Sequence, residues 1–182
     1  MKIKLQDAHR FDDAAGNQIQ VLNCDYTEHG PLPEHFMAAL FRWQSALDDR
    51  GIARADHFAR DLSALTGARD KWHLFNVEAS DPGGFYLEHR ARIGAYYNEH
   101  RVEHLPLALW PFPAQIRAHS LSLQTVRAEA LAPQLSLISR VFGESPQAYL
   151  RLLCPLSEDG RHVTHVASFV ELQGPRILES LP

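Results

Sequence analysis

The segment YLRLLCPLSEDGRHVTHVASFVEL, residues 149–172, carries the clearest structural signal in the chain. Its two halves are rich in leucine and β-branched residues, and SEDG at 157–160 has the composition of a turn, so the segment predicts an antiparallel hairpin. Successive side chains of a strand point to opposite faces. Leu152 and Leu153 should therefore lie on opposite faces of a central strand, with at least one fully buried.

Three other segments have strand composition. QLSLISRVF at 134–142 comes just before the hairpin, and WHLFNV at 72–77 is separated from FYLEHRARI at 85–93 by the turn signal DPGG at 81–84. Alternation within 85–93 gathers an apolar set on one face: Phe85, Leu87, His89, Ala91 and Ile93. The sequence thus predicts five strands, paired as hairpins.

Helical periodicity marks the regions between and before these strands. Residues 33–50 repeat apolar side chains at helical spacing (Phe36, Ala39, Leu40, Trp43 and Leu47), and Gly51 suits a helix C-terminus. A shorter helix is predicted over 56–66, with Asp56 as its N-cap. Residues 113–131 carry a third stripe, which should face the sheet: Ile116, His119, Leu123, Val126 and Ala130.

The order of these elements predicts an α+β fold, a five-stranded antiparallel sheet with helices on one face. Residues 1–69 are expected to be a lead-in and amphipathic helical extension that packs on the core. Within them, 1–31 are polar apart from the stretch Ile19 to Leu22. Residues 70–172 are expected to form the domain, and 173–182 a tail.

Composition argues against several classes of protein. The 182 residues include 18 basic and 22 acidic side chains, a formal net charge of -4, without the basic runs that a nucleic-acid binder needs. The N-terminal residues lack the apolar core of an export signal, and no segment reaches the length of a membrane span. Two cysteines do not make a disulfide framework, so we expect a cytoplasmic protein.

Residues 39–172 resemble a bacterial PAS-type family whose members are mostly uncharacterised. The resemblance includes Trp43 with Arg54, and the second strand, where Phe85, Tyr86, Arg90 and Gly94 match the family pattern. The most specific part is the late hairpin, which matches at Tyr149, Arg151, Leu152, Leu153, Pro155, Leu156, Asp159 and Gly160. The stretch AYYNEHRVEHLPL, at 95–107, departs from the family, which has glycines there, so the resemblance does not indicate a ligand.

The resemblance implies a PAS-like sheet and a non-enzymatic signalling module that binds a small molecule or a protein partner. No output domain is recognised on the chain, so a signal would pass to another protein. The resemblance implies no catalytic residues and no cofactor. Candidates for a ligand pocket are His89, Arg90, Tyr97, His119 and Arg151.

Each candidate also has a structural interpretation. Arg90 and Arg151 sit among apolar strand residues, where each either pairs with Glu88, Glu171 or a carbonyl, or anchors a carboxylate or phosphate ligand. His119 is either a core histidine or a haem ligand, and the first is more common for a lone histidine.

Metal and flavin sites are less well supported. His100 and His104 have the spacing of a metal pair, but Pro106 follows closely and no third ligand is apparent, so a solvated face is favoured. Cys24 in LNCDY precedes all the predicted strands, which is the wrong place for a flavin-binding cysteine. We therefore predict neither a metal nor a coloured cofactor.

The alternative function is a small α+β enzyme in which His89 or His119 acts as general base. Such a base needs a carboxylate or tyrosine within hydrogen-bond reach. Convergent polar groups around a titratable histidine would favour the enzyme, and a closed apolar core would favour the interaction module.

Met37 and Phe41 point to self-association. On an ideal helix they fall roughly 100° or more from the centre of the apolar stripe, so a helix docked by one face leaves both partly exposed. We expect a homodimer with both residues in its interface. The alternative is that residues 1–31 fold back over them, through Ile19 to Leu22.

Overall fold

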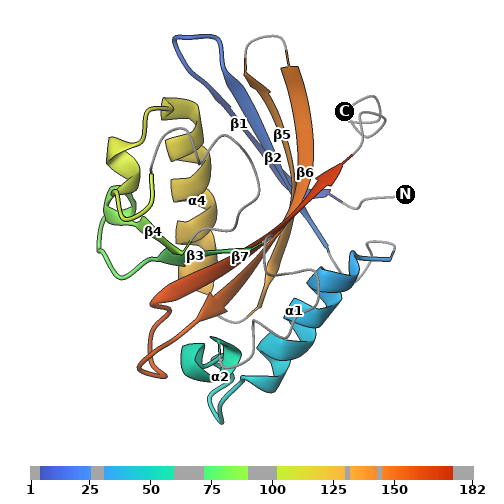
Figure 1. Cartoon of the computed structure of the whole chain (residues 1–182), viewed down its shortest axis with the longest axis vertical. Helices are drawn as coiled ribbons and strands as arrows, with labels where there is room; N and C mark the ends of the chain where they lie inside the picture. The colour runs from blue at the N-terminus through green and yellow to red at the C-terminus, as the bar shows by residue number, and fades with distance from the viewer. Residues whose placement is uncertain are drawn as a thin grey trace.

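The computed structural model describes residues 5–25, 31–59, 72–89, 102–129, 132–142 and 145–173 (Figure 1). Seven strands form one sheet: β1 (Leu5–Asp12), β2 (Gln18–Cys24), β3 (Trp72–Asn76), β4 (Tyr86–His89), β5 (Gln134–Phe142), β6 (Ser145–Leu156) and β7 (His165–Gln173). The helices are α1 (Glu34–Ser45), α2 (Ala55–Ala59) and α4 (Pro113–Glu129), with 3-10 turns η2 (Pro82–Gly84) and η3 (Leu107–Leu109). Within the described ranges no helix is both long and apolar enough to cross a membrane.

The strand order in the sheet is β1-β2-β5-β6-β7-β3-β4, and every neighbouring pair is antiparallel. Strands β5, β6 and β7 follow one another as a meander, and the hairpins β1–β2 and β3–β4 join it at opposite sides. The predicted hairpin of residues 149–172 is confirmed as β6 and β7, in which Leu152 pairs with Phe169. Strand β7 begins at His165, so residues 157–164 connect the strands with a longer loop than the turn we predicted.

The predicted five-stranded sheet with helices on one face is wrong. The sheet has seven strands, α1 and α2 lie on one face, and α4 lies on the other (Figure 1). The physical reason is that the central strands are apolar on both sides, so each face needs its own cover.

The two additional strands come from the residues that the sequence indicated as a polar lead-in. Strand β2 pairs with the edge of β5, for example Val21 with Ile138, and β1 pairs with β2. Ile19, Val21 and Leu22 are buried in this arrangement. They are therefore not free to fold back over α1, as the alternative for Met37 and Phe41 required.

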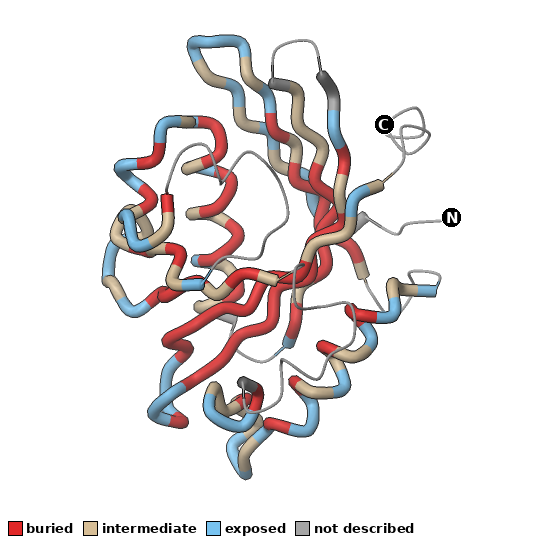
Figure 2. The backbone as a smooth tube through the Cα atoms, in the orientation of Figure 1, coloured by how far each residue is buried: buried red, intermediate tan, exposed pale blue. Residues whose placement is uncertain are grey.

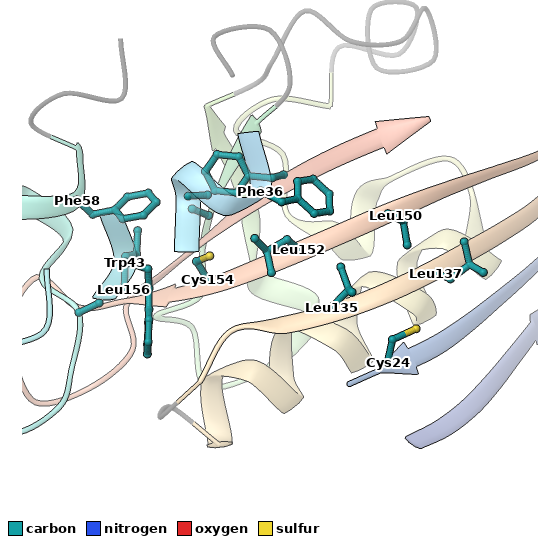
Figure 3. Packing of buried hydrophobic residues seen from close by; sticks show 14 of the residues in the cluster. Cys24, Phe36, Trp43, Phe58, Leu135, Leu137, Leu150, Leu152, Cys154 and Leu156 are labelled. Carbon is teal, nitrogen blue, oxygen red and sulfur yellow. The ribbon is translucent and has the colours of Figure 1, made fainter. Parts of the chain in front are cut away.

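The face beneath α1 holds the larger core cluster (Figure 3). Leu152 and Cys154 of β6 point toward Phe36 and Trp43 of α1, which confirms the predicted apolar stripe from Phe36 to Trp43. Leu47, the last residue predicted for the stripe, lies after the end of the helix and is exposed. The indole Nε1–H of Trp43 donates to the carbonyl of Pro155 at 2.8 Å, so a polar atom in this core is satisfied.

The opposite face packs against α4. Leu123 and Val126 of α4 contact a cluster that contains Leu153 of β6 and Phe75 of β3, so the predicted stripe of this helix does face the sheet. Leu152 and Leu153 are both fully buried, on opposite sides, which confirms the expectation for the central strand. The buried core of β6 is visible along the middle of Figure 2.

Two local predictions need correction. Helix α1 ends at Ser45, and Gly51, with a φ of 77°, lies in the following turn instead of at the helix terminus. Asp56 lies inside α2, which begins one residue earlier, so it is not the N-cap. The predicted ends of the second helix (60–66), of the second strand (90–93) and of the third helix (130–131) lie outside the described residues.

Leu152→Ala and Leu153→Ala should each lower the free energy of unfolding by about 2 to 5 kcal/mol, because each leaves a cavity in a well-packed cluster. Leu172→Ala in β7 is the control, since that side chain is 65% exposed and its loss should change stability by less than about 0.5 kcal/mol. Urea denaturation measures all three. An unchanged midpoint for both buried variants would refute the two-sided burial of β6.

Candidate ligand pocket

A pocket of about 410 Å³ opens at the end of the sheet where α2 meets β3 and β7. This volume lies within the range of small-molecule sites. Its floor is apolar and its rim carries charged groups. The lining residues are Arg54, Ala55, Asp56, Phe58, Trp72, Leu74, Glu88, Leu156, Glu158 and His165.

Short backbone hydrogen bonds hold the α2 wall against the end of β6. The N–H of Ser157 donates to the carbonyl of Ala53, and the N–H of Ala55 donates to the carbonyl of Ser157, both at 2.9 Å. The guanidinium of Arg54 then donates to the carbonyl of Glu158 at 2.6 Å. These contacts fix the position of Phe58, which is buried against Phe169 at a ring distance of 6.3 Å.

His165 is the buried polar centre of the pocket. Its Nε2 lies 2.9 Å from an oxygen of Glu88, and its Nδ1 lies 2.9 Å from the hydroxyl of Thr164 and 3.9 Å from Glu158. The N–H of Glu158 also donates to the Thr164 oxygen, at 3.0 Å. Both ring nitrogens are therefore engaged, with Nε2–H donating to the carboxylate of Glu88.

Trp72 lines the pocket at β3 and is packed against His89. The rings of Trp72 and His89 stack at 4.5 Å with an interplanar angle of 29°. His89 was expected on the apolar face with Phe85 and Leu87, but it is exposed. The reason is a register shift between Leu74 and Phe75, which pairs His89 with Leu74 on the α1 side of the sheet.

A second pocket, of about 430 Å³, lies across the β6–β7 connection. One of its charged groups, Asp159, is bound within the loop itself. Asp159 accepts hydrogen bonds from the N–H groups of Arg161 and His162 and from the hydroxyl of Ser157, and these donors hold the pKa of its carboxyl well below the usual range. Gly160, with a φ of 68°, forms the turn as predicted. These bonds shape the loop, so the first pocket is the better candidate for a ligand.

The structure brings two predicted site residues together, away from both pockets. Arg151 of β6 and His119 of α4 are buried between the sheet and the helix, where the guanidinium donates to the hydroxyl of Ser122 at 2.6 Å and lies 3.4 Å from Nδ1 of His119. Nε2 of His119 meets the side-chain amide of Gln115 at 3.2 Å. Burial first, and then the positive charge of Arg151, hold the pKa of His119 well below its usual value of 6.5.

The carboxylates suggested as partners of Arg151 lie elsewhere. Glu88 contacts His165, and Glu171 lies 3.8 Å from His35 on the α1 side. Arg90 and Tyr97, the other two candidates, lie outside the described residues, as does His100. Among the described residues no group of three or more His, Cys, Asp or Glu side chains is arranged to hold a metal ion.

Sequence reasoning missed the residues that line the candidate pocket. Glu88 and His165 are 77 positions apart and become neighbours because β3 pairs with both β4 and β7. In the sequence, residue type was the one signal for this site, because a histidine at the start of an apolar strand is unusual.

No family model, curated protein or solved structure matches the chain. The resemblance to the PAS-type family therefore stays a prediction.

The buried His119 should make stability depend on pH. The unfolded chain takes up a proton near pH 6.5, whereas the folded protein keeps this imidazole neutral to lower pH, so stability falls as the pH drops below 6.5. His119→Gln should make this fall shallower, by at most about 1.4 kcal/mol per pH unit, the value for one proton.

Denaturant unfolding at intervals from pH 7.5 to 5 measures this slope. His57→Gln is the control, because His57 is exposed on α2 and away from the cluster. Equal slopes for wild type and His119→Gln would mean that His119 takes up its proton at the same pH in the folded protein and in the unfolded chain.

Proposed function

We propose that the protein is a non-enzymatic module that binds a small organic ligand in the pocket between α2, β3, β4 and β7. The supporting observation is the composition of this pocket, in which an apolar floor of Phe58, Trp72 and Leu156 lies beside polar groups centred on His165. Such a combination of apolar surface with a few oriented polar groups is typical of small-molecule sites.

The contacts of the histidines support binding over catalysis. A general base needs a ring nitrogen that can reach the substrate. His165 has the carboxylate partner that such a base requires, but its side chain is only 5% exposed and the Thr164 hydroxyl that it contacts is also buried, so neither group is accessible to a substrate. His119 contacts Arg151 and Gln115 beneath α4, and His89 is exposed and stacked on Trp72.

A substitution that fills the pocket tests this function. Ala55 lines the pocket at the start of α2, so Ala55→Phe should place a ring inside it, whereas His57→Phe, on the exposed side of the same helix, should not. We expect a fragment library screened by ligand-observed NMR to give hits that compete for one site, with a Kd of about 1 mM.

Ala55→Phe should weaken these hits at least about tenfold, and His57→Phe should leave them unchanged. Thermal unfolding of both variants shows whether the fold is retained. Hits that bind Ala55→Phe as tightly as the wild type would place the site elsewhere and refute the proposal.

We also propose that the protein forms a homodimer through α1. Met37 is 54% exposed and Phe41 is 71% exposed, on the side of the helix turned away from the buried Phe36 and Trp43. The β1–β2 hairpin pairs with β5 and leaves both side chains accessible. Large exposed apolar side chains that lie one turn apart are a common feature of interfaces.

Light scattering across micromolar concentrations tests the dimer. The wild type should have twice the mass of one chain, and Phe41→Glu should be a monomer, because a charge in an apolar interface is costly to bury. Leu109→Glu is the matched control, since Leu109 is 66% exposed on η3 and the dimer should persist. A monomeric wild type, or a dimeric Phe41→Glu, would contradict the interface.

A further inference from the structure

The lining of the candidate pocket has an excess of negative charge. Three carboxylates, Asp56, Glu88 and Glu158, face one guanidinium, that of Arg54. Arg54 lies 3.5 Å from Asp56, so these two charges largely cancel. The other two carboxylates, those of Glu88 and Glu158, both lie beside His165.

These two carboxylates lie close to each other in space. Glu88 contacts Nε2 of His165 at 2.9 Å, and Glu158 lies 3.9 Å from Nδ1 of the same ring, so one imidazole separates them. Their side chains are 41% and 65% exposed, which leaves carboxylate oxygens accessible from the pocket. A cation placed beside the ring would be attracted by both.

The negative charge of these carboxylates also affects Tyr86 of β4. The pKa of Tyr86 is raised, first by burial and then by the negative charges of Glu88, Glu78 and Glu158. The negative potential therefore extends over this end of the sheet and is not limited to one contact.

The remaining lining is suited to a flat apolar group. Trp72 is held in place by its stack with His89, and Phe58 and Leu156 are buried beneath the pocket. Aromatic faces attract cations as well as apolar groups. The negative rim and the aromatic floor thus favour the same class of molecule.

We propose that the pocket binds an organic ammonium ion with an aromatic or other flat apolar body. The apolar body packs on Trp72, and the ammonium group binds beside the His165 ring, within reach of Glu88 and Glu158. This inference rests on the proposed ligand-binding function and adds the charge and shape of the ligand.

Three probes that share a phenyl group and differ in charge test the inference: 2-phenylethylamine, 2-phenylethanol and 3-phenylpropionate. Titration of the isotope-labelled full chain at pH 7.5, followed by NMR, gives the three Kd values. We expect the amine to bind about five- to tenfold more tightly than the alcohol, and the carboxylate most weakly. The advantage of the amine should shrink as salt is added.

Variants separate the charge from the rest of the pocket. Glu88→Gln and Glu158→Gln should each weaken the amine about two- to fivefold and leave the alcohol unchanged, so the alcohol reports that the pocket is intact. Glu34→Gln, at the exposed start of α1, is the matched control and should change neither.

The outcomes distinguish this inference from the function on which it rests. If the three probes bind equally and Ala55→Phe abolishes all of them, the pocket binds ligands but has no preference for cations. If the carboxylate binds most tightly, or if the amine is unaffected by both glutamine variants, the inference is overturned. If none of the probes binds while other fragments still compete for the pocket, this inference alone fails; if no fragment binds either, both proposals fail.

Discussion

The burial of β6 on both faces is the constraint on which the rest of the fold depends. Leu152 and Leu153 are neighbours in the chain, and both are fully buried, in separate clusters. A strand in this position needs cover on each side, so α1 and α4 must lie on opposite faces of the sheet. The same strand pairs with β5 and β7 along most of its length, which makes it the centre of the sheet as well.

The two faces of the sheet contact their helices through different kinds of side chain. Beneath α1 the sheet presents an almost continuous apolar surface. Beneath α4 the apolar clusters are interrupted by Arg151, which binds Ser122 and approaches His119 on the helix. Because buried polar groups need specific partners, this contact favours one position of α4 on the sheet, whereas apolar contacts alone would tolerate a shift along the helix.

The candidate pocket depends on several irregular features at one end of the sheet. The residues before α2 pair with Ser157, which extends the end of β6 toward the helix. The register shift in β3 places the ring of His89 against that of Trp72. Strand β7 begins at His165, which lies next to Glu88. Together these features position the pocket residues that come from α2, β3, β4 and β7.

The sequence by itself determined the local structure. The apolar period of 3.6 placed α1 and α4 and their inward stripes, and the composition of 72–77, 134–142 and 149–172 placed the strands, because periodicity and turn chemistry act between residues close in the chain. The sequence also indicated that both faces of the sheet must be covered, because the adjacent Leu152 and Leu153 point to opposite faces. The predicted fold nevertheless had five strands with helices on one face. The tertiary structure alone decided that β1 and β2 extend the sheet beside β5, that Arg151 meets His119, and that Glu88 meets His165. These contacts join segments that are far apart in the chain, and they exist because of the order of the strands in the sheet. That order follows from the packing of the whole molecule and not from the pattern within any one segment.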